Sequence, residues 1–191
     1  AAGSCHTVLL RSDGAAVACG CNDHGQCDLP AQVAAGGCHE LAAGMTFTQV
    51  AAGADHTVLL RSDGTAAACG WNVDGRCDLP ALPAGLTYTQ VAAGRIYTVL
   101  LRSDGSATAC GGNAFGQCDL PAPAEGLGFT QVAAGAFHTV LLQSDGTAVA
   151  RGGNGEGQCD LPAPAEGLSF TQVAAGWSHA VLLQSDGTAV A

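Results

Sequence analysis

The stretch Val50-Ala-Ala-Gly-Ala-Asp-His-Thr-Val-Leu-Leu-Arg-Ser-Asp-Gly64 recurs along the chain with few changes. Counted from its Ala-Ala-Gly, the copies begin at residues 1, 51, 92, 133 and 174, so the intervals are 50, 41, 41 and 41 residues. A fixed period of this size is typical of proteins built from repeated supersecondary units. We therefore interpret residues 1–191 as a single repeat array of five units.

Each unit contains three runs of residues that predict β-strands. In the third unit, residues 87–94 and 97–103 are rich in β-branched and apolar residues, and Asp104-Gly105 separates them from a third run at 106–110. Asp-Gly between two such runs is the strongest short signal for a β-hairpin. The predicted blades span roughly residues 1–19, 46–69, 87–110, 128–151 and 169–191, and connectors rich in glycine and proline join them.

The Asp-Gly pair occurs in all five copies, which favours a structural turn over a catalytic or calcium-binding carboxylate. The turn aspartates are Asp13, Asp63, Asp104, Asp145 and Asp186. The second strand of each unit lacks polar–apolar alternation, so both of its faces are expected to be buried. Radial stacking of such sheets gives a β-propeller, and linear stacking gives a solenoid. The first connector is longer than the others and adds Cys38, His39 and Glu40, for which the sequence suggests no role.

The repeats resemble those of the regulator of chromosome condensation superfamily. The residues that match its pattern are Ala52-Gly53-x-x-His56, Asp63-Gly64 and Gly70-x-Asn72-x-x-Gly75. The resemblance implies an all-β fold, namely a β-propeller, or an open arc of one, of about five three-stranded antiparallel blades. It also implies that these blades are part of a seven-bladed ring rather than a closed ring of five. In repeat style, the chain is most similar to the propeller-type β-lactamase-inhibitor protein. Because both ends fall inside a repeat, we expect a fragment of a longer protein.

Charge and hydropathy exclude two classes of partner. The formal net charge is −10, the chain has no lysine, and six arginines stand against sixteen acidic residues. A nucleic-acid surface needs clustered cations, so we expect no nucleic-acid partner. No apolar run approaches the length of about 18 residues that a membrane-spanning helix requires, so we expect no membrane insertion. The compartment cannot be inferred from these features.

Six cysteines form pairs that are eight residues apart in three of the units, and two interpretations remain open. A local disulfide closes each loop if the chain turns back at its glycine-rich middle. Alternatively, the cysteines are small buried side chains with free thiols. The pairs are Cys19/Cys27, Cys69/Cys77 and Cys110/Cys118, whereas Cys159 lacks a partner because Arg151 occupies the other position. No Cys-x-x-Cys occurs, so we expect no metal site.

No residue pattern indicates catalysis or a cofactor. A nucleophile with an adjacent base, paired carboxylates or a phosphate-binding loop would stand out from the repeats, and none does. A histidine recurs before the second strand as His6, His56, His138 and His179, with Tyr97 in the same place. We interpret this position as a structural hydrogen bond. Recurrent asparagines are interpreted as loop caps; they are Asn22, Asn72, Asn113 and Asn154.

Two short windows vary between repeats while the strands barely change: the loop between the first and second strands, and the loop after the third. With antiparallel strands, both windows are expected at the same end of each blade, opposite the Asp-Gly turns. Aromatic and arginine residues on loops of a rigid scaffold are typical of protein-binding hot spots. The predicted partner-binding residues are Trp71, Asp74, Arg95, Ile96, Tyr97, Phe115, Phe137 and Trp177. For Trp71 and Trp177, filling of gaps between blades is an open alternative.

The leading hypothesis is a non-enzymatic protein-interaction or scaffold module that presents one variable loop face to a protein partner. One alternative is an architectural accessory subunit of a larger assembly, because open blade edges seek partners. Another alternative is an enzyme inhibitor, which the resemblance to the propeller-type inhibitor implies.

Overall fold

The structure is a computed structural model that describes residues 1–29 and 45–191. Within these residues the chain forms strands, turns and irregular segments but no helix. The strands are β1 (His6–Leu10), β2 (Ala16–Gly20), β3 (Phe47–Ala52), β4 (His56–Arg61), β5 (Ala66–Gly70), β6 (Tyr88–Ala93), β7 (Tyr97–Arg102), β8 (Ala107–Gly111), β9 (Phe129–Ala134), β10 (His138–Gln143), β11 (Ala148–Gly152), β12 (Phe170–Ala175), β13 (Ala180–Gln184) and β14 (Ala189–Val190).

The strands make five small antiparallel sheets, which we call blades 1 to 5 in chain order. Blades 2 to 5 each have three strands that follow one another along the chain, as in β3-β4-β5. Blade 1 has two strands, β1 and β2, and an isolated bridge from Ala2 to Thr7 stands where the other blades have their first strand. The predicted all-β arc of antiparallel blades is confirmed, except that the first blade is not fully three-stranded.

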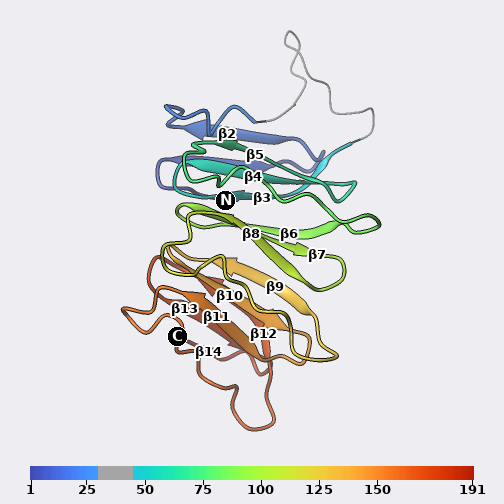
Figure 1. The fold of residues 1–191 in the computed structure, drawn as a ribbon, viewed down its shortest axis with the longest axis vertical. Coiled ribbons are helices and arrows are strands. Elements are labelled where there is room, and N and C mark those ends of the chain that lie inside the picture. Colours follow the sequence, from blue (N-terminus) through green and yellow to red (C-terminus); the bar gives the residue numbers. More distant parts are fainter. Residues whose placement is uncertain (30–44) are drawn as a thin grey trace.

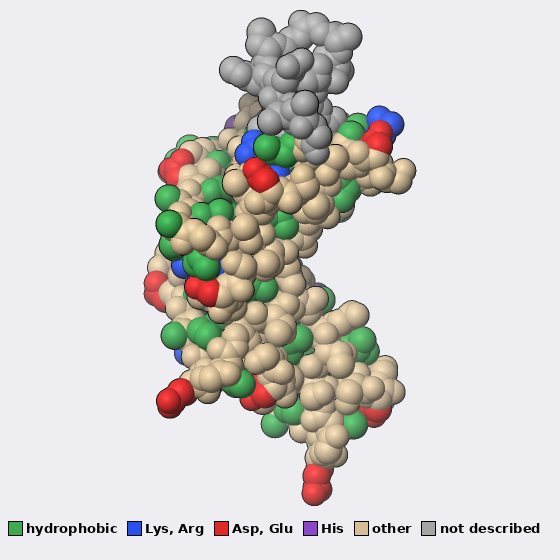
Figure 2. All heavy atoms as spheres, turned by 90° about the vertical axis from the view of Figure 1, so that its right-hand side faces the viewer, with side chains coloured by type: hydrophobic (Ala, Val, Ile, Leu, Met, Phe, Trp, Pro, Cys, Tyr) green, Lys and Arg blue, Asp and Glu red, His purple; other side chains and the backbone are tan. Residues whose placement is uncertain are grey.

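The blades stack in sequence order into an open arc (Figure 1). The first strands of neighbouring blades lie against one another, because β6 contacts both β3 and β9, and β9 contacts β12. These strands line the concave side of the arc, and the space-filling view shows the molecule hollowed on one side (Figure 2). The third strand of each blade is therefore outermost.

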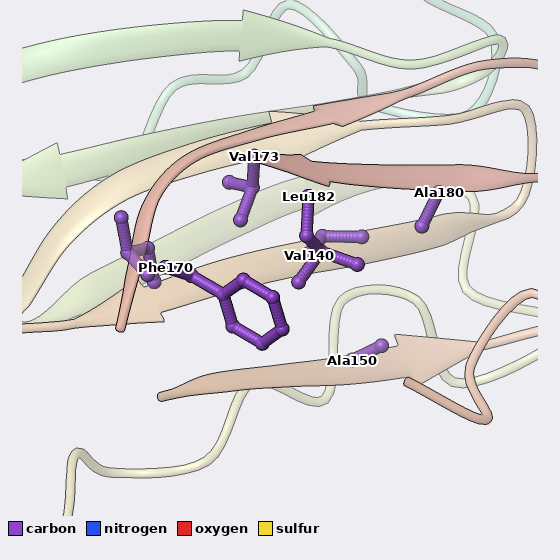
Figure 3. Packing of buried hydrophobic residues seen from close by; sticks show 7 residues of the cluster. Val140, Ala150, Phe170, Val173, Ala180 and Leu182 are labelled. Carbon is purple, nitrogen blue, oxygen red and sulfur yellow. The ribbon is translucent and has the colours of Figure 1, made fainter. Parts of the chain in front are cut away.

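The core lies between the blades, which explains why the second strands lack alternation. Val58, Leu59 and Leu60 on β4 are all buried, although successive side chains point to opposite faces of the sheet. At the boundary of blades 4 and 5, Phe170 packs with Val140 and neighbouring apolar residues (Figure 3). The aromatic residue that begins each first strand is buried in this way in blades 2 to 5, as Phe47, Tyr88, Phe129 and Phe170.

Main-chain and glutamine hydrogen bonds also join neighbouring blades. Tyr88 N donates to the carbonyl of Gly64 in the preceding turn at 2.7 Å. On the concave side, Val91 N donates to Oε1 of Gln49 at 2.8 Å, and the next two blade pairs repeat this contact. The repeated contacts are Val132 N to Gln90 Oε1 at 3.2 Å and Val173 N to Gln131 Oε1 at 2.6 Å. The invariant Thr-Gln-Val sequence thus has a structural role that sequence reasoning missed.

The Asp-Gly turns lie at the opposite end of each blade from the loop between its first two strands. Asp104 Oδ1 accepts hydrogen bonds from Ser106 N at 2.9 Å and from Ser106 Oγ at 2.7 Å. Gly105 has φ of +80°, a conformation that L side chains rarely adopt. These hydrogen bonds hold the pKa of the Asp104 carboxyl below its usual value. The four other turns have the same main-chain contact to the aspartate.

The inserted residues of the first connector, with Cys38, His39 and Glu40, lie outside the described residues. No helix long and apolar enough to cross a membrane occurs in residues 1–29 and 45–191.

Candidate protein-binding face

The two variable loops of each blade meet at one end of the sheet. Trp71 N, in the loop after β5, donates to the carbonyl of Asp55, in the loop between β3 and β4, at 2.8 Å. The equivalent bond joins Gly112 to Ile96 at 2.9 Å and Gly153 to Phe137 at 2.8 Å. We call this end the loop face; it consists of residues 4–5, 54–55, 95–96, 136–137 and 177–178 with residues 21–24, 71–74, 112–115 and 153–156.

Buried histidines fix the base of the loop face. His56 Nε2 lies 3.0 Å from Oγ1 of Thr98 in the next blade, and Thr98 Oγ1 donates to the carbonyl of Arg76 at 2.7 Å. His6 and Thr57 make the same contact at 3.0 Å between blades 1 and 2. His6 and His56 therefore each join their own blade to the following one, as expected for a structural hydrogen bond. Burial, with a smaller contribution from the Arg76 charge, lowers the pKa of His56 to about 3.

Tyr97 takes the histidine position in blade 3, and its assignment to the binding surface was wrong. Its side chain is fully buried. The hydroxyl donates to the carbonyl of His138 in the next blade, and Thr139 Oγ1 donates to the hydroxyl at 3.2 Å. Burial raises the pKa of Tyr97 above its ordinary value. The residue belongs to the packing between blades because it replaces the histidine of the repeat.

The recurrent asparagines cap the loops that follow the third strands. Asn72 Oδ1 accepts from Cys77 N at 2.8 Å, and Asn72 Nδ2 donates to Asp78 Oδ1 at 2.7 Å. Asn22, Asn113 and Asn154 make the same pair of contacts. Each loop is therefore closed by side-chain bonds to its own main chain, which gives it a defined shape.

Large side chains project from this rigid base. Trp71, Phe115 and Trp177 are 38%, 56% and 58% exposed. Trp71 stacks on His24 of the first blade, with ring centroids 4.1 Å apart. Phe137 lies against Phe115 at 5.1 Å between centroids. The loop face thus carries an aromatic surface that continues from blade to blade.

Arg95 lies between two of these aromatic residues, Phe137 and Trp177. Its guanidinium carbon is 5.3 Å from the ring centroid of Phe137 and 5.2 Å from that of Trp177, which are cation–π distances. The two ion pairs in the described part of the chain, Arg11–Asp13 and Arg76–Asp74, do not include Arg95. Its guanidinium is therefore held in place without a carboxylate.

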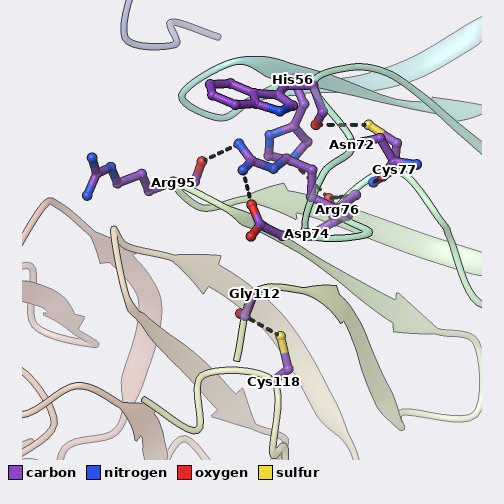
Figure 4. Close-up of polar contacts among 10 residues, drawn as sticks. His56, Asn72, Asp74, Arg76, Cys77, Arg95, Gly112 and Cys118 are labelled. Atoms are coloured by element: carbon purple, nitrogen blue, oxygen red, sulfur yellow. Dashed lines mark hydrogen bonds and ion pairs between the residues drawn. The ribbon is translucent and has the colours of Figure 1, made fainter. Parts of the chain in front are cut away.

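Arg76 is a residue of this face that sequence reasoning missed. It is 3% exposed, and Figure 4 shows its guanidinium between Asp74 and the main chain of Arg95. Arg76 Nη2 pairs with the Asp74 carboxylate, and Nη1 donates to the carbonyl of Arg95 at 3.3 Å. The other repeats have glutamine here, and Gln117 Oε1 accepts from Phe115 N at 3.0 Å instead. The sequence signal was the departure from that glutamine.

A cavity of about 190 Å³ opens where the loops of all five blades converge on the concave side. Its walls are mostly main chain and small side chains, because each blade contributes residues of its Ala-Ala-Gly. Arg95 and Trp177 are its only large lining side chains.

The six cysteines of the three pairs, for which a disulfide and free thiols were both open, are free thiols, as are all nine cysteines in the described ranges. Cys69 Sγ lies 3.7 Å from the carbonyl of Gln26 in the preceding blade, whereas Cys77 Sγ lies 3.9 Å from the carbonyl of Trp71. The paired thiols therefore point toward different main-chain oxygens instead of toward each other. Burial raises the pKa of Cys69 to about 12 and that of Cys77 to about 11. Cys69 and Cys77 are thus partly buried thiols, whereas Cys19 of the first pair is exposed.

Within residues 1–29 and 45–191, no cluster of three or more His, Cys, Asp or Glu side chains could hold a metal ion.

The family model of the regulator of chromosome condensation (RCC1) repeat matches residues 1–26, 47–76 and 129–158. These matches fall on blades 1, 2 and 4 and together cover less than half of the chain. No curated protein sequence matches it.

Solved structures of several proteins share the fold of this chain. Prp20p from Saccharomyces cerevisiae matches with a TM-score of 0.77 and 20% identity, over 97% of this chain and 55% of that one. Human WBSCR16 matches with a TM-score of 0.78 and 20% identity, over 98% of this chain and 59% of that one. The ectodomain of the receptor kinase CR4 from Physcomitrella patens matches with a TM-score of 0.74 and 18% identity, over 97% of this chain and 48% of that one. The chain thus spans about half the length of these proteins, and its five blades form an open arc of the propeller fold that they share.

Proposed function

We propose that this chain is a non-enzymatic protein-interaction module that binds a protein partner through the loop face. The observation that carries the proposal is the exposure of Trp71, Phe115 and Trp177, with Arg95 beside Trp177, on loops that vary between otherwise constant repeats. Aromatic and arginine side chains dominate the binding energy of protein interfaces. Their scaffold is rigid, so little conformational entropy is lost when a partner binds.

The stacked guanidinium of Arg95 indicates that the partner contributes a carboxylate to the interface. The Arg95 guanidinium is stacked by Phe137 and Trp177, and stacking of a planar guanidinium leaves the N–H groups at its edge free to donate. A carboxylate on the partner would accept two parallel hydrogen bonds from such an edge. The remaining predicted residues on this face, Ile96 and Asp74, would flank the contact, and Asp74 would also keep Arg76 in place.

Proteins of similar fold are reported with protein partners. Prp20p is described with its binding properties to Gsp1p and histones, and another structure shows Kap60 bound to yeast RCC1. Because identity is only 20% in both cases, these partners are not transferred to this chain. They support the general proposal that an RCC1-type arc serves as a binding surface.

The test is capture of partners by the purified chain and by two variants. One variant replaces Trp71, Phe115, Phe137 and Trp177 by alanine on the loop face. The matched control replaces Thr65, Ser106 and Thr147 by alanine at the turns of the opposite end. We expect the first variant to lose its partner at unchanged circular dichroism, and the control to retain it. Equal capture by the wild type and the loop-face variant would contradict the proposal.

An architectural role in a larger assembly is the second candidate, and exposed apolar residues at the ends of the arc favour it. Leu9 and Val17 of blade 1 are 54% and 41% exposed, whereas Leu59, at the position of Leu9 in blade 2, is fully buried. At the other end, Val181 and Leu183 line a cavity of about 210 Å³. Replacement of Leu9 and Val17 by serine would abolish assembly in this case and leave loop-face binding intact. Enzyme inhibition rests on repeat style alone.

A further inference from the structure

Cys5 and Cys21 occur in the first repeat only, one in each of the two loops that form the loop face. Cys21 N donates to the carbonyl of Cys5 at 2.8 Å. This bond is the blade 1 equivalent of the Gly112–Ile96 and Gly153–Phe137 bonds. Cys5 and Cys21 are therefore directly opposite each other, one step beyond the last registered pair of β1 and β2, His6 with Gly20.

The geometry of such a pair suits a disulfide. Opposite residues of a hydrogen-bonded antiparallel pair have Cα atoms about 5.5 Å apart, and Cα separations in disulfides run from about 4.4 to 6.8 Å. Blade 3 shows that the two side chains share one space. A Cβ built on Gly112 would lie 2.5 Å from Cδ1 of Ile96, the residue in the position of Cys5. In blade 1 both positions carry a side chain with one sulfur atom.

The surroundings of this pair differ from those of the partly buried cysteines Cys69 and Cys110. Cys5 is exposed, whereas burial accounts for the high pKa values of Cys69 and Cys110. Gln26 Nε2 lies 3.7 Å from Cys5 Sγ, and Cys21 Sγ lies 3.4 Å from the Asp23 carboxylate. The largest influence on the Cys5 thiol is a hydrogen bond with the Cys21 side chain, which raises the pKa of Cys5.

We propose that Cys5 and Cys21 form a thiol-modification site that closes to an intramolecular disulfide on exchange with a small-molecule disulfide such as oxidised glutathione. The thiolate of one cysteine attacks the glutathione disulfide, forms a mixed disulfide and releases one glutathione thiolate. The thiolate of the second cysteine then attacks the protein sulfur of that mixed disulfide and releases the other glutathione thiolate. Two protein thiols are oxidised, two glutathione molecules are formed, and each released thiolate takes up a proton that a cysteine lost.

The Cys5–Cys21 disulfide would hold the two loops of blade 1 in a fixed position on the loop face. Residues 4–5 and 21–24 belong to different loops that a single main-chain hydrogen bond joins at present. A covalent link would hold these two loops together in the presence of a partner. This inference concerns the chemistry of the two thiols and does not depend on the proposed function.

The test uses the full chain with oxidised glutathione at about pH 8.5, where an exposed thiol supplies some thiolate. After free thiols are blocked with N-ethylmaleimide, we expect a species with two fewer blocked thiols. Digestion at aspartate residues without reduction should then give a peptide before Asp13 linked to the peptide 13–22. Fragmentation of that linked pair should assign the bond to Cys21 and not to Cys19.

Single serine variants complete the test. C21S should abolish the linked pair and leave Cys5 as a mixed disulfide with glutathione, whereas C19S, C27S and C38S should retain the link. A link from Cys5 to any other cysteine, a link that persists in C21S, or a wild-type Cys5 that stays unlinked would each overturn the proposal. The urea-unfolded chain under the same conditions verifies that the oxidant is active, because its cysteines react without regard to the fold.

Discussion

Acid should weaken this protein well above the pH at which its carboxylates titrate, because its inter-blade histidines are buried in the neutral form. The pKa of His56 falls from 6.5 in the unfolded chain to about 3 in the folded chain. Between these values the unfolded state binds a proton that the folded state does not, so stability decreases as the pH falls. From about pH 7.5 to about pH 5.0, His56 alone should remove about 2 kcal/mol from the free energy of unfolding.

His6 and His138 should add to the loss, because burial lowers the pKa of each. The turn carboxylates of Asp63 and Asp104 do not interfere, since their pKa values are lowered from 3.8 and their contribution is lost only at more acidic pH. The assay is urea denaturation at the two pH values for the wild type and for His56→Tyr. Tyr97 shows that tyrosine fits this position of the repeat.

The variant should lose about 2 kcal/mol less than the wild type over this pH interval. Equal losses in the two proteins would refute the assignment of the acid sensitivity to His56. His24, which is exposed on the loop face, provides the matched control, because His24→Tyr should leave the wild-type loss unchanged.

Three further predictions concern packing and loop closure. Ala180 stands where the other repeats have threonine, and both ring nitrogens of the buried His138 lack a hydrogen-bond partner within the described residues. Ala180→Thr should supply this partner and raise the free energy of unfolding, measured by urea denaturation, by about 1 kcal/mol. A destabilised variant would show that the threonine hydroxyl does not bond to His138. Phe129→Ala should lower the free energy of unfolding by about 3–5 kcal/mol, because it leaves a cavity between blades. Phe115→Ala on the surface should lower it by less than about 0.5 kcal/mol. Similar melting temperatures for the two variants would contradict the packing of Phe129 between blades. Arg76→Ala should lower the free energy of unfolding by about 1–3 kcal/mol, because it removes two loop contacts. Arg76→Gln should be closer to neutral, because glutamine fills this position in the other repeats. Equal shifts in melting temperature for the two variants would show that glutamine cannot replace Arg76 here.

Features that recur could be predicted from the sequence, because each copy supplies an independent observation of the same position. The blades follow from the strand and Asp-Gly pattern, and the structural role of His56 follows from its recurrence. The meeting of the two variable loops follows from antiparallel strand order, and the bond from Trp71 to Asp55 shows it directly.

Features that occur once, or that depend on a neighbouring blade, could not be predicted. Tyr97 adjoins a variable loop in sequence but occupies the buried histidine position. The glutamine contacts on the concave side need the spatial offset between blades, which no single repeat contains. Cys69 and Cys77 share a loop, yet their thiols turn toward different carbonyl oxygens. Cys5 and Cys21 occupy different positions of the repeat, so the eight-residue spacing of the paired cysteines does not connect them.

The most direct test of the loop face is cross-linking mass spectrometry of the protein with its native partner. The proposed function predicts cross-links concentrated at residues 54–55, 71–74, 95–96, 114–115, 136–137 and 177–178. Cross-links confined to the Asp-Gly turns, the connectors or the ends of the arc would contradict it and would favour the architectural role instead.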